Sequence, residues 1–260
     1  MIKLLIFTLL SSLSYSVTAA NYYFSSTGND ANDGLSPVSP WKSLSKVYLY
    51  PIFTAHFQPG DSLLLKAGDS FDGPMILSAG NSGTVGSRIT IDRYGIGANP
   101  IVYGDHPSAV WSAVVAHPGV YSTDVSAGGG TVEAVFDING NAYTKTNQGG
   151  DSLDVWLAKF NAGNWGLSGS VYIRTLDGNA PPQMHLWEFT TISIGSSYVT
   201  VQNIESCNGK FGIATGVASG VIARQNFVHD TLNIGIFYGD NSTNGEVASN
   251  IVTRNGETCI

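Results

Sequence analysis

The chain has 260 residues, of which 43% are hydrophobic and 12% are charged, and 31 residues are glycine. Its formal net charge of −7 excludes the broad basic surface that a nucleic-acid partner requires, although this average is compatible with a local basic cleft for an anionic polymer. Sparse charge and abundant glycine are typical of an all-β chain with many tight turns.

The first twenty residues, 1–20, have the pattern of a signal peptide. Lys3 is followed by an apolar run over residues 4–10, and the segment ends in small residues at Ala19 and Ala20. Because about ten apolar residues are too few to span a bilayer, we predict cleavage before Asn21 and a secreted or periplasmic protein. No second long apolar run follows. We therefore expect no membrane span in the mature chain, and we expect a monomer.

Residues 21–103 are predicted to form an N-terminal cap and the first coils of a stacked β-structure. In the loop at 28–34, Asp30 and Asp33 carry oxygens of the kind that Ca²⁺ prefers, although Asn-Asp-Gly is also a plain turn signal. Trp41, Leu44 and Val47 recur at three-residue spacing, which predicts a short amphipathic helix that covers the end of the stack. Apolar runs at 62–66, 88–92 and 100–103, bounded by Gly and Pro, predict buried parallel strands.

Residues 104–190 break this rhythm, and we predict that they form an inserted antiparallel β-subdomain. Segments 132–136 and 169–174 have the composition of strands, with a turn signal at 139–140. Trp156 and Trp165 offer aromatic rings on which a sugar can stack, with packing inside the subdomain as the default interpretation.

Residues 191–260 contain a repeat. Asn203, Asn226 and Asn250 are each followed by a large apolar residue and are spaced by 23 and 24 residues. A period in the twenties, with β-branched residues and Asn or Gly turns, predicts a solenoid whose coils bury a shared core. We expect the three amides to form a structural ladder along its axis. The third copy ends in mid-repeat at Ile260, so we expect a protein truncated at its C-terminus, with an open edge.

Several motifs carry a resemblance to a known superfamily. They are Tyr-Tyr-Phe-Ser-Ser at 22–26, Gly-Asn-Asp-Ala-Asn-Asp-Gly at 28–34, Pro-Trp-Lys-Ser-Leu at 40–44, Pro-Gly-Asp-Ser-Leu-Leu-Leu at 59–65 and Gly-Thr-Val-Gly-Ser-Arg-Ile-Thr-Ile at 83–91. With the repeat at 192–260, they resemble secreted right-handed parallel β-helix proteins of the pectate lyase-like superfamily. These include family nine polysaccharide lyases, the chondroitinase-B and alginate-lyase group, and β-helix glycosidases. The resemblance implies an all-β, right-handed parallel β-helix with an N-terminal capping helix and a carbohydrate-active function.

A β-eliminating lyase needs a base that removes the C5 proton of a uronate and a cation that stabilises the resulting anion. The resemblance implies Lys or Arg in these roles, with Ca²⁺ held by acidic side chains, on the face over residues 211–214 and 234–238. The candidate catalytic residues near this face are Lys210, His229, Asp230, Asp240 and Arg254, and Tyr238 is a candidate carbohydrate-binding residue. No cluster of three or four carboxylates occurs among them, so the hallmark of the calcium-dependent lyase is missing. Turn and capping roles stay open for each candidate.

We therefore predict an exported polysaccharide lyase-like protein that acts by β-elimination on a uronate-containing polymer. Glycoside hydrolysis by two carboxylates and glycan binding without cleavage are the alternatives. In family nine lyases, as the resemblance implies, the calcium turn and the catalytic Lys lie on later coils, so we expect the 260-residue chain alone to be inactive. Cys207 and Cys259 occupy different phases of the repeat, two coils apart, and we expect them to be unpaired.

Overall fold

The computed structural model describes residues 18–48, 57–105, 110–124, 132–137, 141–181, 184–187, 190–257 and 260. The predicted signal peptide therefore lies almost wholly outside the described residues. Within these ranges the chain is nearly all β-structure, with two short helices, α1 (Ser45–Tyr48) and α2 (Leu153–Ala158). No helix in the described ranges is long and apolar enough to cross a membrane.

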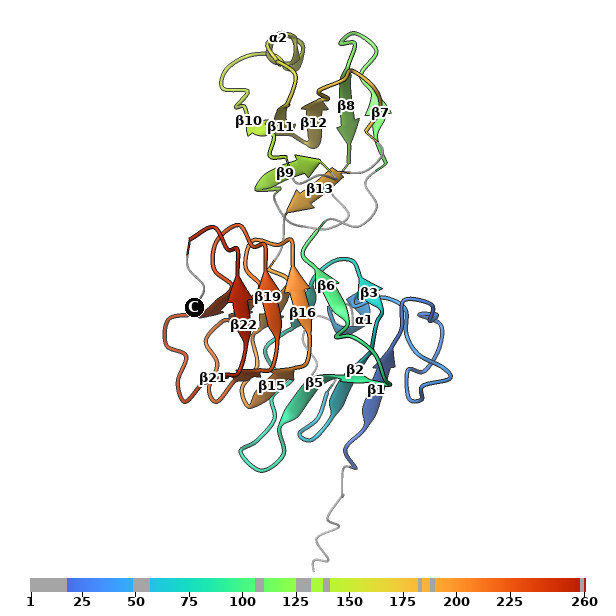
Figure 1. Cartoon of the computed structure of the whole chain (residues 1–260), viewed down its shortest axis with the longest axis vertical. Helices are drawn as coiled ribbons and strands as arrows, with labels where there is room; N and C mark the ends of the chain where they lie inside the picture. The colour runs from blue at the N-terminus through green and yellow to red at the C-terminus, as the bar shows by residue number, and fades with distance from the viewer. Residues whose placement is uncertain are drawn as a thin grey trace, which may run out of the picture.

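Three parallel sheets build the body of the protein (Figure 1). Sheet A contains, in spatial order, β1 (Asn21–Phe24), β2 (Ser62–Lys66), β5 (Ile89–Tyr94), β15 (Val199–Gln202), β18 (Ile222–Arg224) and β21 (Glu246–Ala248). Sheet B contains β3 (Ser70–Phe71), β6 (Ile101–Tyr103), β16 (Glu205–Cys207), β19 (Phe227–His229) and β22 (Ile251–Thr253). Sheet C contains β4 (Met75–Leu77), β14 (Ile192–Ile194), β17 (Ile213–Thr215) and β20 (Ile236–Tyr238).

The chain visits the three sheets in rotation. From β14 onward it passes from sheet C to sheet A to sheet B three times, and we call one such passage a coil. Each strand pairs in parallel with the strand one coil later, as Thr200 does with Ile222 and Ile222 with Glu246. The two intervals are therefore 22 and 24 residues long, close to the period seen in the sequence.

Alternation along each short strand decides which side chains enter the core. Val201 and Ala223 of sheet A, Val228 of sheet B, and Ile213 and Ile236 of sheet C are each at most 1% exposed. Because neighbouring strands are in register, the buried side chains of successive coils stack into columns of one hydrophobic core.

The segment around α1 covers the N-terminal end of this core. Trp41, Leu44 and Val47 are 5%, 1% and 5% exposed and belong to the core cluster. Only Ser45–Tyr48 is helical, whereas Trp41 forms a β-bridge with Phe24. The three-residue spacing therefore identifies a buried face, but the helix occupies only the last part of it.

Single residues with a left-handed backbone turn the chain from sheet A to sheet B. Asn203, Gln225 and Ser249 occupy this corner in successive coils, with φ values of 57°, 57° and 56°. Asn tolerates this conformation better than Gln or Ser does, because its short amide side chain hydrogen-bonds locally.

The register corrects the predicted asparagine ladder. Asn226 and Asn250 do stack, and Asn226 Nδ2 donates to Asn250 Oδ1 over 3.0 Å. Ile204, not Asn203, occupies the equivalent position one coil earlier, and its backbone N–H donates to Asn226 Oδ1 over 3.1 Å. Asn203 lies in the left-handed corner instead and donates to Asp92 Oδ1 over 2.9 Å. The alignment was displaced by one residue because this coil is 22 residues long.

Between β6 and β14 the chain leaves the three sheets and builds a separate subdomain, which we call the insertion. Its described elements are β7 (Ser112–Ala113), β8 (Val120–Thr123), β9 (Ala134–Asp137), β10 (Thr144–Lys145), α2, β11 (Asn164–Ser168), β12 (Ser170–Arg174) and β13 (Met184–Trp187). Five strands form one sheet in the order β10-β11-β12-β8-β7, in which only the β10–β11 pair is parallel. β9 pairs antiparallel with β13. The helix α2 was not predicted, and Ser152 caps its first turn by accepting from the backbone N–H of Val155.

Candidate functional site

The turn that leads from sheet B to sheet C carries most of the candidate residues. The insertion leaves the coils in this turn, between β6 and β14, and the corresponding turns of later coils carry Lys210, Asp230 and Arg254. In Figure 1, β16, β19 and β22 direct their carboxyl ends toward the insertion. Parallel pairing thus brings residues 22 to 24 positions apart side by side at this end of sheet B.

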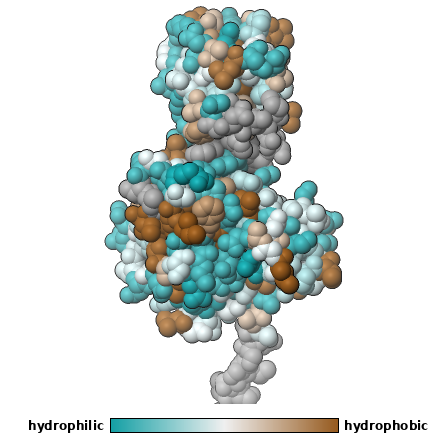
Figure 2. Space-filling model, in the orientation of Figure 1, coloured by the Kyte–Doolittle hydropathy of each residue, from teal (hydrophilic) through white to brown (hydrophobic). Residues whose placement is uncertain are grey.

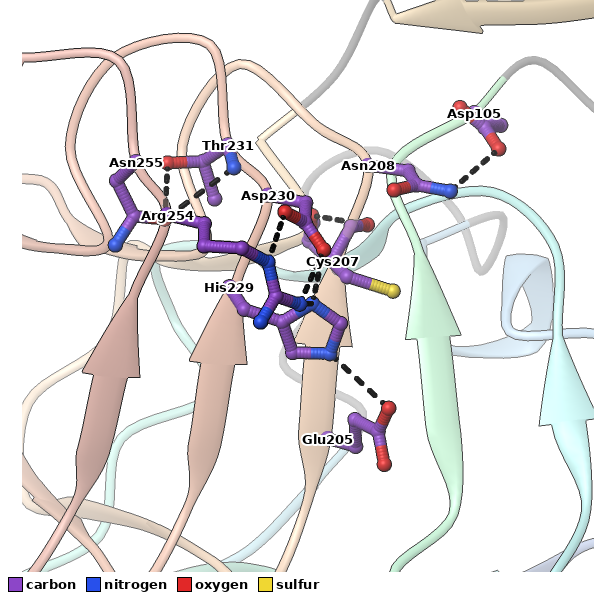
Figure 3. Close-up of polar contacts among 10 residues, drawn as sticks. Asp105, Glu205, Cys207, Asn208, His229, Asp230, Thr231, Arg254 and Asn255 are labelled. Carbon is purple, nitrogen blue, oxygen red and sulfur yellow. Dashed lines mark hydrogen bonds and ion pairs between the residues drawn. The ribbon is translucent and has the colours of Figure 1, made fainter. Parts of the chain in front are cut away.

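His229 is the centre of a polar group that we call the His229 cluster, formed by Glu205, His229, Asp230 and Arg254 (Figure 3). Nδ1 of His229 lies 2.6 Å from Asp230 Oδ2, and Nε2 lies 3.1 Å from Glu205 Oε1. The His229 side chain is 11% exposed and that of Glu205 is 24% exposed. Two carboxylates therefore contact the two ring nitrogens of one largely buried imidazole.

Arg254 binds Asp230 with a two-pronged contact. Nε donates to Oδ1 over 2.7 Å and Nη2 donates to Oδ2 over 2.6 Å. These hydrogen bonds hold the pKa of Asp230 below its usual value, with a smaller contribution from His229 and against the effect of partial burial. The same carboxylate raises the pKa of Arg254. Asp230 is therefore ionised in the folded protein at neutral pH.

The contacts of His229 determine where its ring carries protons. A neutral imidazole donates from one nitrogen only, and the short contact to the ionised Asp230 assigns that proton to Nδ1. Arg254 Nη2 also lies 3.0 Å from Nδ1, but it cannot donate to a nitrogen that carries a proton, so its productive partner is Asp230. A hydrogen bond between Nε2 and Glu205 Oε1 then needs one further proton, which these two groups share. The Glu205–His229 contact is thus an acid–base pair.

The outer face of sheet B beside this cluster is apolar. Phe227 and Ile251 lie in the same row of the sheet as Glu205, and the Phe227 ring is centred 4.2 Å from the His229 ring. Ile251 is 65% exposed. Figure 2 shows a hydrophobic patch over β19 and β22, bordered by hydrophilic surface. This apolar surface therefore adjoins the convergent polar groups of the His229 cluster.

Cys207 lies on the same face but is not a nucleophile. It pairs with His229 on one side and Tyr103 on the other. Its thiol is free and buried, and burial raises its pKa far above the usual value, with nearby carboxylates adding to the effect. The thiol is therefore protonated at neutral pH. Cys259 lies outside the described residues, so the predicted lack of pairing between them stays a prediction.

Lys210 contacts the insertion rather than the His229 cluster. Its Nζ lies 3.1 Å from Glu133 Oε1, and both side chains are about one-third exposed, at 37% and 34%. The cation that the lyase prediction assigned as a base thus has a carboxylate partner from the insertion.

Tyr238 and Asp240 lie apart from the cluster. The Tyr238 hydroxyl lies 2.9 Å from the carbonyl oxygen of Val221 and 3.0 Å from that of Glu246. Burial raises the pKa of Tyr238 to about 12. Tyr238 is thus anchored through its hydroxyl to the backbone of two neighbouring coils, and its partly buried ring packs against the core. Asp240 is exposed in the turn after β20.

The two tryptophans predicted to stack on sugars are core residues of the insertion. Trp156 and Trp165 are 2% and 1% exposed. Trp156 packs edge-on against Phe160, whereas Trp165 belongs to the larger cluster of the insertion. Their rings have no open face for a sugar, which corrects the carbohydrate-binding assignment in favour of the packing alternative.

Asp30 and Asp33 fasten the N-terminal loop. Asp30 Oδ1 accepts from the backbone N–H groups of Lys42 and Ser43 at 2.8 and 2.9 Å, and Asp33 Oδ1 accepts from Leu35 N at 3.0 Å. Across the described ranges, no three His, Cys, Asp or Glu side chains come together in a way that could hold a metal ion. The turn alternative accounts for both carboxylates, and the calcium assignment stays a prediction.

Glu205 is the member of the cluster that the sequence did not reveal. It lies two positions after Asn203, and no local motif marks it as functional. Its place beside His229 follows only from the 22-residue coil, which pairs Glu205 with Phe227 and Cys207 with His229. Only an alignment of the strands in this register identifies Glu205 as a neighbour of His229.

Comparisons find carbohydrate-active proteins among those to which this chain is similar. No protein-family model matches the chain. A stretch of 79 residues, which is 30% of this chain, is 39% identical to the lacto-N-biosidase of Bifidobacterium longum subsp. longum. The structure of XylC in complex with xylose aligns with 83% of this chain at a TM-score of 0.55 and 16% identity. A glycoside hydrolase structure aligns with 84% of the chain at a TM-score of 0.51 and 10% identity.

The chain spans less than two thirds of each of these proteins. It covers 5% of the lacto-N-biosidase, 41% of XylC and 63% of the glycoside hydrolase. At these identities the two structural matches are similarities of fold alone.

Proposed function

We propose that this chain belongs to an exported, carbohydrate-active protein with a right-handed parallel β-helix, and that the outer face of sheet B is its glycan site. The observation that carries the proposal is the His229 cluster, in which Glu205 and Asp230 contact opposite nitrogens of one imidazole. The rotation of the chain through three parallel sheets supports the β-helix. The similarity of 79 residues to a lacto-N-biosidase supports a carbohydrate substrate.

In this proposal the apolar residues hold the sugar and the polar cluster moves a proton. Phe227 and Ile251 present the surface on which the apolar face of a pyranose packs. Glu205, as a carboxylic acid, protonates the glycosidic oxygen as its bond to the anomeric carbon breaks. A water molecule forms the new bond to that carbon and gives its proton to His229 Nε2, which returns it to Glu205. Asp230 orients His229 through Nδ1, and His229 exchanges a proton with Glu205 through Nε2. Asp230 is a positioning residue here because Arg254 occupies both of its oxygens.

The charge balance favours hydrolysis of a neutral glycan over β-elimination. A uronate substrate requires a cation that neutralises its carboxylate, and Arg254 and Lys210 are both paired with carboxylates of this chain.

β-Elimination on a uronate-containing polymer is the second candidate. The specific observation in its favour is His229, whose Nε2 is placed to act as a base once Glu205 moves aside. Glycan binding without cleavage is the third candidate. The experiment below distinguishes it from hydrolysis and from β-elimination.

The test is product analysis with matched variants. The purified chain is incubated with neutral oligosaccharides such as xylan fragments and lacto-N-tetraose, and in parallel with pectate and alginate. New reducing ends without ultraviolet absorbance mark hydrolysis, whereas an absorbing unsaturated uronate marks elimination. Loss of activity in Glu205→Gln, but not in Glu246→Gln on exposed sheet A surface, supports the assigned site. Equal activity of wild type and Glu205→Gln would overturn it.

Finer assignments of the chain's parts, oligomeric state and cofactor accompany this proposal. Residues 1–20 are a signal peptide that directs export, and residues 21–103 form the N-terminal cap and the first coils. Residues 104–190 are the insertion, and residues 191–260 form the later coils. Size-exclusion chromatography with light scattering tests the proposed monomer. Isothermal titration with Ca²⁺ on wild type and Asp30→Asn tests the calcium assignment.

A further inference from the structure

Asp61 is a buried carboxylate at the start of the fold. It is 2% exposed. Its Oδ1 accepts from the backbone N–H of Ala20 over 2.7 Å, and its Oδ2 accepts from that of Gln58 over 2.8 Å. Among the described residues, no Lys, Arg or His forms an ion pair with it. Burying a carboxylate is costly unless a charge or several donors compensate for it.

Of the residues that the structure describes, Ala20 is the first that is hydrogen-bonded to the sheets. Its carbonyl accepts from Ser62 N over 2.9 Å, directly before the β1–β2 pairing of Asn21 with Ser62. Ala20 is half-buried, whereas Ala19 is exposed. The chain therefore enters the fold at Ala20, next to the carboxylate of Asp61.

Two adjacent peptide bonds follow an alanine and are candidates for signal-peptide removal. Cleavage after Ala20, as predicted from the sequence, has Thr18 and Ala20 at the third and the last position before the cut, and cleavage after Ala19 has Val17 and Ala19 there. Cleavage after Ala20 removes the N–H that Asp61 binds and the carbonyl that Ser62 binds. Cleavage after Ala19 keeps both hydrogen bonds.

We propose that the Ala19–Ala20 bond is the processing site and that Asp61 is the receptor for the new amino terminus. Hydrolysis adds one water, leaving a carboxylate on Ala19 and an amino group on Ala20. That group is largely protonated at neutral pH, because an α-amino group has a pKa of about 7.7–8.0 in model peptides. The N–H donor of Ala20 thereby becomes an ammonium group paired with Asp61. This inference rests on the proposed export, and it moves the cleavage site one residue before Asn21.

The first test reads the amino terminus directly. The full chain is expressed with its own leader in a secreting bacterial host, and the exported protein is analysed by intact mass and N-terminal sequencing. A first residue of Ala20 supports the proposal, and a first residue of Asn21 overturns it. A chain that keeps Met1 contradicts export itself, so the two failures are distinguishable.

The second test asks whether Asp61 binds the charge. Full-length mature proteins that begin at Ala20 or at Ala19 are released from a fusion by a protease that leaves no extra residue. Both keep the N–H of Ala20, but only the first has its ammonium group at Asp61. We expect the Ala20 form to melt roughly 2–4 °C higher, the shift that about 1 kcal/mol gives in a chain of this size. Asp61→Asn should remove this difference, and equal melting of the two wild-type forms would contradict the proposal.

Discussion

Arg254 donates a hydrogen bond to each carboxylate oxygen of Asp230, although the two residues are one full coil apart in the sequence. The Nε–Oδ1 and Nη2–Oδ2 distances are 2.7 and 2.6 Å. Both residues also have left-handed backbone, with φ values of 53° and 50°. The same corner conformation in successive coils thus aligns a guanidinium with a carboxylate and fixes the group that orients His229.

Replacing Arg254 should release Asp230. In Arg254→Ala the pKa of Asp230, followed by NMR titration, should rise toward its ordinary value because the hydrogen bonds that lower it are lost. Arg254→Lys should recover only part of the effect, since an ammonium group cannot form the two parallel contacts. An unchanged Asp230 pKa in Arg254→Ala would mean that the pair does not form in solution.

The same pair should make stability depend on pH in the acid range. Because the folded-state pKa of Asp230 lies below the model value of 3.8, its contribution is complete above pH 3.8 and is lost as pH falls through the folded-state value. We expect the free energy of unfolding, measured in urea between neutral pH and about pH 3, to fall less steeply in Asp230→Asn than in wild type. Asp240→Asn, on an exposed turn, is the control and should follow wild type.

Cys207 should resist thiol reagents in the folded protein. Burial raises the pKa of its thiol, so the reactive thiolate is scarce at neutral pH and the sulfur is shielded. Alkylation followed by peptide mass spectrometry reports Cys207 separately from Cys259. We expect slow modification of Cys207 in buffer and rapid modification in urea. Equal rates in the two conditions would show that this part of sheet B opens readily.

The sequence predicts the stacked core better than it predicts the site. Ile213 and Ile236 lie ten residues after Asn203 and Asn226 in the repeat and are paired in the structure, because apolar residues recur once per coil where they face the core. Trp41, Leu44 and Val47 were likewise recognised from spacing alone. These features depend on the spacing of apolar residues along the chain, which can be read from a single sequence.

Register, in contrast, depends on the length of each coil. Asn203 was aligned with Asn226, but a 22-residue coil places it opposite Gln225. An error of one residue moves a side chain from one face of a strand to the other, so Glu205 was not recognised as the neighbour of His229. The helix α2 was missed because its six residues are too few for a clear helical period.

The left-handed corner makes Gln225 a site for stabilisation. Gln225 is exposed and has a φ of 57°, which costs a residue with a side chain about 1 kcal/mol. Gln225→Gly should remove this strain and raise the free energy of unfolding by up to that amount, less the extra freedom that glycine has in the unfolded chain. Gln225→Ala keeps the strain and should give no gain. The melting temperatures of the two variants distinguish relief of backbone strain at positive φ from loss of the glutamine side chain.

The asparagine ladder contains Asn226 and Asn250 but not Asn203. We therefore expect substitutions of Asn203 and Asn226 to change the free energy of unfolding by different amounts. Asn226 is 2% exposed, accepts from the N–H of Ile204 and donates to the carbonyl of Val201 over 3.0 Å. Asn226→Ala leaves both buried backbone groups without these partners and should cost roughly 2–4 kcal/mol. Asn203→Gly loses only the hydrogen bond to Asp92 and keeps a residue suited to positive φ, so we expect a loss of about 1 kcal/mol or less. Urea unfolding measures both, and equal losses would support the three-rung alignment of the sequence over the register of the structure.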